Sequence, residues 1–212
     1  PAFGEVGIKK VYNGAIAYTP DGNPIIGPAW DLDNFWLNEG HSFGITAAGG
    51  AGWQLAEWIV EGEPTIDMLG VEPRRFGDYA TKKYLVEKNE EAYSHVFIIH
   101  YPDEERPAAR PLRTAPCYER MKAHGAVFGQ KFGWERPNFF ATDGMLQEDD
   151  WSFRRSRWFE AIRKEVANTT ENVGLLDMTA FAKCRVSGPG AETFLDGFVA
   201  NTLPKNVGGL SL

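Results

Sequence analysis

A run of small residues from Gly40 to Gly52, leading directly into the apolar segment 53–60, constrains this sequence more than any other feature. Glycine adopts backbone conformations that other residues avoid, and it lets a second group approach the main chain closely. We therefore predict a strand that ends near Asn38, a turn built from the small residues, and a helix that stops at Glu61-Gly62.

A helix that begins after such a turn leaves backbone N–H groups unpaired and carries the positive end of its dipole. These donors suit a phosphate or an electron-rich oxygen, such as a flavin carbonyl that becomes anionic on reduction. Glycines before a helix also serve a purely structural purpose, because they allow tight contact between helix and sheet. The spacing does not match the dinucleotide fingerprint. The residues alone leave both interpretations open.

The charge balance excludes several classes of partner. The net charge of −7, without a long block of lysine and arginine, argues against nucleic acid or an anionic membrane as the main partner. Cys117 and Cys184 lie far apart without metal-ligand spacing, which fits a reducing compartment. No apolar run approaches the length of a membrane span. Because the chain begins at Pro1 rather than Met, we expect it to be a piece of a longer protein.

Hydrophobic periodicity predicts a mixed α/β chain. Strands are expected at 25–28 and 34–38, before the small-residue turn, in the order typical of the edge of an α/β sheet. A hairpin is expected in 6–18, turning at Asn13-Gly14. Further helices are predicted at 81–93, 117–124, 158–168 and 191–200, the last with Phe194, Leu195 and Phe198 facing inward. Further strands are predicted at 96–99, 126–132, 172–177 and 182–187.

Few residues suggest catalysis on their own. None of the four histidines has a His, Cys, Asp or Glu partner at metal-ligand spacing, so no metal site is expected. No serine nucleophile elbow or Cys/His arrangement is visible. His41, beside the glycine turn, fits either a cofactor neighbour or a structural histidine. The segment 103–106 fits a solvated loop or a pair of carboxylates in a pocket.

Three groups of segments together resemble one family. The first group resembles the end of the FAD domain of glycine-oxidase-type amine oxidoreductases: Tyr18 to Pro28 and Gly40 to Gly52. The second resembles the central domain of dimethylglycine and sarcosine dehydrogenases: Glu72 to Phe76, Tyr101-Pro102, Glu105-Arg106, Arg110-Pro111 and Gly133 to Pro137. The third resembles the opening of an aminomethyltransferase-like, folate-binding domain: Trp158-Phe159, Val173 to Met178, Phe181 to Lys183, Val186 to Pro189, Phe194 to Asp196 and Ala200-Asn201.

The order of these segments resembles the dimethylglycine/sarcosine dehydrogenase family and implies its fold class, a mixture of α/β and α+β. Residues 1–72 would be the C-terminal part of a glycine-oxidase-type FAD domain. Residues 73–137 would form a small central α+β domain. Residues 138–212 would begin the aminomethyltransferase-like folate-binding domain.

The resemblance also implies an activity: an FAD-dependent dehydrogenase that oxidises the N-methyl group of dimethylglycine or sarcosine. The one-carbon unit would pass to tetrahydrofolate in the downstream domain, and an electron-transfer flavoprotein would be the acceptor. FAD-contacting residues would be His41, Ser42, Phe43, Gly44, Ile45 and Thr46, with Pro24 and Ile25 in a loop near the substrate face of the flavin. Related oxidases carry a lysine where Thr46 aligns, which favours a dehydrogenase.

The same resemblance implies what this chain lacks. The first FAD-binding segment would precede Pro1, and the catalytic acid of the folate domain would follow Leu212, so we expect no catalytic residue here and no turnover by the chain alone. The protein would be cytoplasmic in a bacterium or lie in the mitochondrial matrix of a eukaryote. Two alternatives are a folate-dependent one-carbon transferase module and a non-catalytic interdomain scaffold.

Overall fold

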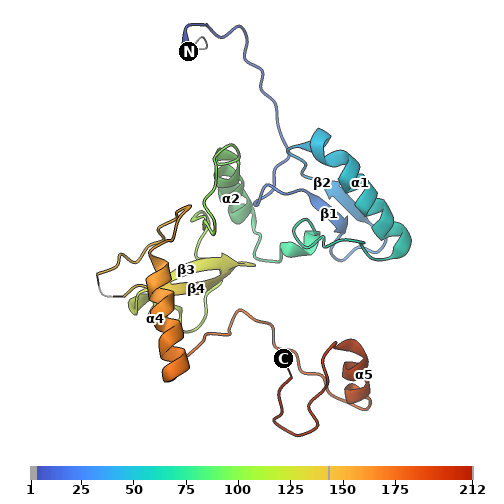
Figure 1. The fold of residues 1–212 in the computed structure, drawn as a ribbon. Coiled ribbons are helices and arrows are strands. Elements are labelled where there is room, and N and C mark those ends of the chain that lie inside the picture. Colours follow the sequence, from blue (N-terminus) through green and yellow to red (C-terminus); the bar gives the residue numbers. More distant parts are fainter. Residues whose placement is uncertain (1–3, 143, 212) are drawn as a thin grey trace. The chain divides into compact units, whose positions relative to one another are not determined.

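The computed structural model describes residues 4–142 and 144–211, which divide into two compact units, one ending at Asp177 and the other beginning at Met178 (Figure 1). The second unit contains one helix, α5 (Ala191–Phe198), among its described residues. The elements of the first unit are β1 (Ile25–Pro28), β2 (Trp36–Glu39), α1 (Gly44–Glu61), the 3-10 helix η2 (Pro73–Arg75), α2 (Lys82–Ser94), α3 (Tyr118–Ala123), β3 (Ala126–Lys131), β4 (Trp134–Phe140) and α4 (Trp158–Glu171).

The strands β1 and β2 form an antiparallel hairpin against which α1 packs. Ile26 of β1 and Trp58 of α1 are buried in a common core with Ala51 and Met68. Gly27 has φ +137°, and a Cβ there would lie 2.9 Å from Cζ3 of Trp58. The strand can therefore lie directly against the tryptophan ring only because residue 27 has no side chain.

The helix α1 begins at Gly44, so the predicted turn of small residues is wrong over most of its length. Only residues 40–43 form the turn, and residues 47–52 lie within the helix. Alanine is the strongest helix former, and each interior glycine costs about 1 kcal/mol relative to alanine. Burial of Trp58 and Ala51 against β1 offsets this cost, so tertiary packing overrides the local preference of the glycines. The helix ends at Glu61 with Gly62 in the left-handed conformation, as predicted.

The helix α2 confirms the prediction for 81–93. The Thr81 side chain caps it by accepting a hydrogen bond from the Tyr84 backbone N–H at 3.3 Å. Tyr84, Lys88 and Ala92 are buried on one face. The strand predicted directly after α2 is wrong, because residues 95–97 form turns and Phe97, Ile98 and Ile99 are exposed.

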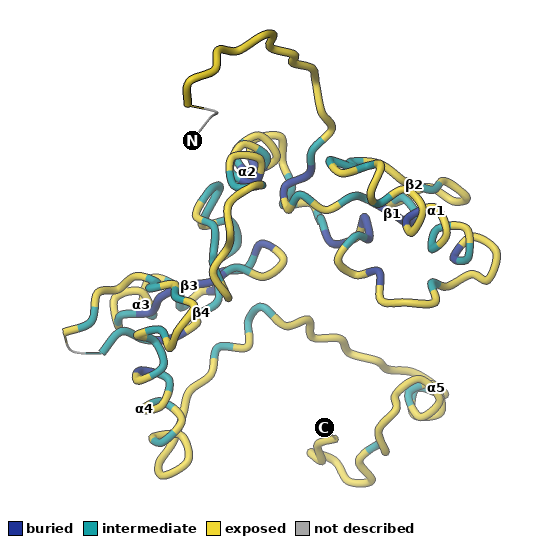
Figure 2. The backbone as a smooth tube through the Cα atoms, turned by 45° about the horizontal axis from the view of Figure 1, so that its top comes forward, coloured by how far each residue is buried: buried dark blue, intermediate teal, exposed yellow. Residues whose placement is uncertain are grey.

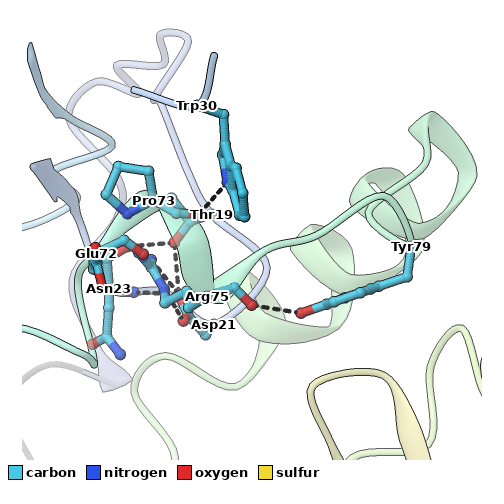
Figure 3. A network of polar contacts seen from close by, with 8 residues as sticks. All are labelled: Thr19, Asp21, Asn23, Trp30, Glu72, Pro73, Arg75 and Tyr79. Carbon is cyan, nitrogen blue, oxygen red and sulfur yellow. Dashed lines mark hydrogen bonds and ion pairs between the residues drawn. The ribbon is translucent and has the colours of Figure 1, made fainter. Parts of the chain in front are cut away.

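A network centred on Arg75 joins the turn at residues 19–23 to the segment around η2 (Figure 3). Arg75 Nε lies 2.7 Å from Oδ2 of Asp21, and its guanidinium also donates to the carbonyl oxygens of Asn23 (3.0 Å) and Glu72 (3.1 Å). Tyr79 donates its hydroxyl to the Arg75 carbonyl at 2.8 Å. The Arg75 side chain is only 6% exposed. The arginine thus fixes the turn before β1 to the chain that follows α1.

The strands β3 and β4 form a second antiparallel hairpin, covered by α4. Val127 and Phe139 of the hairpin pack against Ala161 of α4, which is fully buried. Arg110 reaches this hairpin from the preceding loop. Its guanidinium pairs with the buried Glu135 through two hydrogen bonds of 2.9 and 2.7 Å. The predicted strand 126–132 and helices 117–124 and 158–168 are confirmed, with small shifts at their ends.

Several predicted strands do not form. The segments 6–18, 172–177 and 182–187 have no regular secondary structure here, and nearly all of their residues are exposed (Figure 2). A strand needs a partner for its backbone N–H and C=O groups, and the described residues provide none for these segments. Helix α5 forms, but Phe194 and Phe198 are exposed rather than inward, stacking on each other at 5.6 Å. None of the helices described is both long and apolar enough to cross a membrane.

Candidate functional site

The two segments predicted to contact a flavin lie side by side at one end of the β1–β2 hairpin. Ile25, the first residue of β1, is paired with Glu39, the last residue of β2. Gly40 follows with φ +70°, and a Cβ on it would lie 3.9 Å from the Pro24 Cα and 2.8 Å from a methyl group of Thr19. The hairpin and this glycine therefore place Pro24 and Ile25 directly beside the turn that enters α1.

The six predicted residues from His41 to Thr46 form this turn and the start of α1. His41 and Ser42 are half-buried, and Phe43 is the N-cap residue. Gly44 is the first helical residue, and Ile45 and Thr46 are exposed on the first helical turn. His41 Nε2 lies 2.7 Å from Oδ1 of Asn38, whereas its Nδ1 is buried without a hydrogen-bond partner among the described residues.

The N-terminus of α1 has no side chain that caps it or neutralises its positive dipole end. Phe43 provides no side-chain cap, and the first turn contains no acidic residue. The first backbone N–H that closes a hydrogen bond onto the start of the helix is that of Ala47, which donates to the Phe43 carbonyl at 3.1 Å. The N–H groups of Gly44, Ile45 and Thr46 precede it and are the unpaired donors of the first turn. Together with the helix dipole, they favour an anionic or electron-rich oxygen at this end.

A cavity of about 480 Å³, here called the Tyr84 cavity, adjoins both predicted segments. Phe43 from the start of α1 and Asn23 from the loop before β1 line one part of it. Helix α2 and the loop 100–106 supply most of the remainder. Its lining residues are Tyr18, Pro20, Asp21, Gly22, Asn23, Phe43, Tyr84, Lys88, Glu91, Ala92, Val96, His100, Glu104, Glu105, Arg106 and Gln130.

The segment 103–106, for which the sequence left open a solvated loop or carboxylates in a pocket, contributes Glu104 and Glu105 to the lining, whereas sequence reasoning missed the residues that α2 and β3 bring to this cavity. Tyr84 and Lys88 were predicted only to lie in a helix, and Gln130 only to lie in a strand. A signal was present, because a lysine on the apolar face of a helix needs a buried partner. Lys88 finds two: its Nζ lies 2.9 Å from Glu91 and 3.0 Å from the carbonyl oxygen of Arg106.

Burial shifts the ionisation of two groups near this region. It raises the pKa of Tyr84 to about 12, so the phenol stays protonated at neutral pH. It also raises the pKa of the half-buried Asp149, with a smaller contribution from the negative charge of Glu105 and an opposing one from Arg110. The neighbouring Asp150 shows the opposite behaviour, because the hydrogen bond from Arg157 lowers its pKa.

Replacing Asp149 by asparagine is expected to stabilise the chain at neutral pH. A carboxyl whose pKa is raised by folding binds its proton more tightly in the folded state, so its ionisation costs stability as the pH rises through the folded-state pKa. The gain from Asp149→Asn should disappear at acidic pH. Urea unfolding at pH 7 and pH 3.5 measures it.

Asp150→Asn is the matched control for this prediction, and its effect should have the opposite sign: a loss at pH 7 that disappears only as the pH falls below the lowered folded-state pKa of Asp150. A destabilising Asp149→Asn at pH 7 would contradict the assigned cause.

No group of three or more His, Cys, Asp or Glu side chains that could hold a metal ion occurs within residues 4–142 and 144–211. Cys117 and Cys184 are both free.

Sequence models of three domain families match the chain consecutively. The model "FAD dependent oxidoreductase" matches residues 1–58, "FAD dependent oxidoreductase central domain" matches 61–115, and "GCVT N-terminal domain" matches 117–212. This order confirms the predicted domain arrangement. The boundaries 72/73 and 137/138 stay a prediction.

Curated relatives align over nearly the whole chain. Mouse mitochondrial dimethylglycine dehydrogenase is 36% identical over 206 residues, which are 97% of this chain and 24% of the relative. A 4-methylaminobutanoate oxidase (formaldehyde-forming) of Paenarthrobacter nicotinovorans is 33% identical over 90% of this chain and 23% of its own length. Human mitochondrial sarcosine dehydrogenase is 30% identical over 92% of this chain and 24% of its own length. The chain spans about a quarter of the length of these relatives, and it belongs to the dimethylglycine/sarcosine dehydrogenase family of FAD-dependent amine oxidoreductases.

Proposed function

We propose that this chain contributes to an FAD-dependent dehydrogenase that oxidises the N-methyl group of dimethylglycine or sarcosine. The observation that carries the proposal is the uncapped N-terminus of α1, within a segment matched as FAD-dependent oxidoreductase and next to the Tyr84 cavity. FAD, when bound, accepts the hydride equivalent removed from the N-methyl group.

The residues at the start of α1 fit the pyrimidine edge of a flavin. We assign the contacts to His41, Ser42, Phe43, Gly44, Ile45 and Thr46, with Pro24 and Ile25 beside them. No acidic side chain lies in the first turn of α1 and no side chain caps it, so the N–H groups of Gly44, Ile45 and Thr46 can donate to an oxygen that gains negative charge. The buried, unpartnered Nδ1 of His41 is a further polar atom that a ligand could satisfy. These groups would bind and orient the ring, and they would stabilise negative charge on it.

The same proposal implies an electron acceptor and a cellular location for the protein. Thr46 stands where related oxidases carry a lysine, which favours a dehydrogenase, and an electron-transfer flavoprotein would then receive the electrons. We place the protein in the cytoplasm of a bacterium or the mitochondrial matrix of a eukaryote. The mouse and human relatives named above are mitochondrial.

Titration of the ¹⁵N-labelled chain with FAD, oxidised and then reduced under anaerobic conditions, tests the flavin assignment. The backbone amide signals of residues 44–46 should shift in a saturable manner, more strongly with the reduced flavin, because its pyrimidine edge carries the greater negative charge. Shifts confined to other parts of the chain, or none, would reject the assignment.

Ile45→Asp separates flavin binding from helix stability. Ile45 is fully exposed on the first turn of α1. An aspartate there should stabilise α1 by about 0.5 kcal/mol through the helix dipole. It should also weaken binding of reduced FAD about fivefold, since it places like charge beside the proposed contact. Urea unfolding and the flavin titration measure the two effects, and Ile45→Asn serves as the uncharged control. Equal affinity in both variants would count against the site.

A folate-binding contribution is favoured by the match of residues 117–212 to the GCVT N-terminal domain. In this second candidate function, the chain contributes to passing the one-carbon unit to tetrahydrofolate. Titration with tetrahydrofolate tests it: shifts restricted to residues 117–212 support the candidate, and the absence of any shift opposes it.

A further inference from the structure

The Tyr84 cavity contains four acidic side chains, and each of them has at least one internal partner. Asp21 is bound by Arg75, and Glu91 accepts from Lys88 and from the backbone N–H of Ala108 at 2.8 Å. Glu104 accepts from the backbone N–H of Tyr101 at 3.0 Å. Glu105 accepts from the backbone N–H of Gln130 at 3.2 Å. The carboxylates of the lining therefore act as structural acceptors within the chain.

Three donors of the same lining lack an acidic partner among the described residues. The Nε2 of Gln130 is buried and makes no hydrogen bond. Tyr84 is 7% exposed and lines the cavity. The guanidinium of Arg106 contacts only the ring nitrogens of His100, at 3.0 and 3.1 Å, with no carboxylate within salt-bridge distance.

Two of these donors lie where the Tyr84 cavity meets a neighbouring cavity. A second cavity of about 500 Å³ adjoins the Tyr84 cavity, and both are lined by Asp21, Asn23, Tyr84 and Gln130. Tyr84 and Gln130 thus stand on the wall shared by the two cavities. A buried donor without a partner destabilises the folded chain, and an acceptor entering the cavity would provide that partner. One positive charge beside two neutral donors matches a carboxylate.

We propose that the Tyr84 cavity binds a small organic carboxylate, held by the guanidinium of Arg106, the side-chain amide of Gln130 and the hydroxyl of Tyr84. The choice of an N-methylglycine as the natural ligand rests on the proposed function, since a carboxylate is the end that dimethylglycine and sarcosine share. Carboxylate binding itself depends only on the donors of the cavity. The N-methyl group of such a ligand would then point away from the three donors that hold its carboxylate.

Titration of the ¹⁵N-labelled chain with sodium acetate, sarcosine and dimethylamine hydrochloride, at constant ionic strength, tests this inference. The side-chain amide signal of Gln130 should shift saturably with acetate and with sarcosine and should not respond to dimethylamine. Saturable binding of dimethylamine in place of acetate, or no saturable binding of either carboxylate, would overturn the proposal.

Two substitutions assign the binding to these side chains. Gln130→Met and Arg106→Met should each weaken acetate binding at least tenfold, followed through the amide signals of residues 84–92. Both leave the backbone in place, so the Gln130 N–H bond to Glu105 and the Lys88 bond to the Arg106 carbonyl are retained. Gln54→Met, at a half-buried glutamine outside the cavity, is the matched control and should leave the affinity unchanged. Unchanged affinity in both cavity variants, with a native amide spectrum, would refute the assignment.

The outcome is separable from that of the flavin experiment. Acetate binding without flavin-induced shifts at residues 44–46 would leave this inference standing and reject the proposed flavin contact. Flavin-induced shifts without acetate binding would do the reverse.

Discussion

Replacing Phe139 by alanine should lower the free energy of unfolding of the first unit by about 4 kcal/mol. Phe139 is 3% exposed and packs with Val127 and the fully buried Ala161 between the β3–β4 hairpin and α4. The substitution removes most of a buried ring and leaves a cavity that neighbouring side chains refill only in part. Urea unfolding followed by circular dichroism measures the change.

Phe97→Ala is the matched control, because Phe97 is 84% exposed. Its loss should stay below about 1 kcal/mol, since it contributes mainly an edge contact with Phe43. Comparable losses in the two variants would show that the packing of α4 on the hairpin does not determine stability.

Arg75→Met should cost about 3 kcal/mol. The methionine keeps much of the buried stem of the side chain, but Asp21 loses its ion pair, and the carbonyl oxygens of Asn23 and Glu72 lose their donor. Breaking a largely buried charged network by removing one partner is among the more damaging substitutions. Urea unfolding measures the loss, and the amide signals of residues 19–25 report whether the turn before β1 has moved.

Arg163→Met is the control for this experiment. Arg163 pairs with Glu160 on the surface of α4, where the two side chains are 62% and 60% exposed. Exposed pairs of this kind contribute about 0.5 kcal/mol or less. If Arg75→Met costs no more than Arg163→Met, the network of Figure 3 does not stabilise the fold.

Sequence patterns predicted the helices better than the strands. Periods of 3.6 residues located α2, α3, α4 and α5, because a helix satisfies its backbone hydrogen bonds within its own segment. Short β-favouring runs in 6–18 and alternation in 182–187 predicted strands that do not form, since a strand depends on a neighbour that local sequence cannot specify. The start of α1 was misplaced for a related reason: Gly49 and Gly50 suggest a turn, and only the burial of Trp58 makes the helix the better solution.

Sequence alone predicted only those parts of the candidate site that lie within one short segment of the chain. The segments holding Pro24 and His41 were identified separately, and the hairpin brings them together. Tyr84, Arg106 and Gln130 come from elements or loops far along the chain, and their importance lies in the cavity that the fold brings them to line. Which partners such a polar group finds depends on the residues that the fold brings close to it, and the spacing of residues along the sequence does not specify these.

The Arg75–Asp21 ion pair crosses the border between the two matched ranges that end at 58 and begin at 61. Met68 crosses it as well, because it completes the core formed by Ile26 and Trp58. A chimera that takes residues 1–60 from one homologue and the remainder from another would therefore inherit half of an ion pair and an incomplete core. Productive crossover points between members of this family should lie beyond Tyr79, and recombinants cut earlier should survive only when both parents carry compatible residues at 21, 68 and 75.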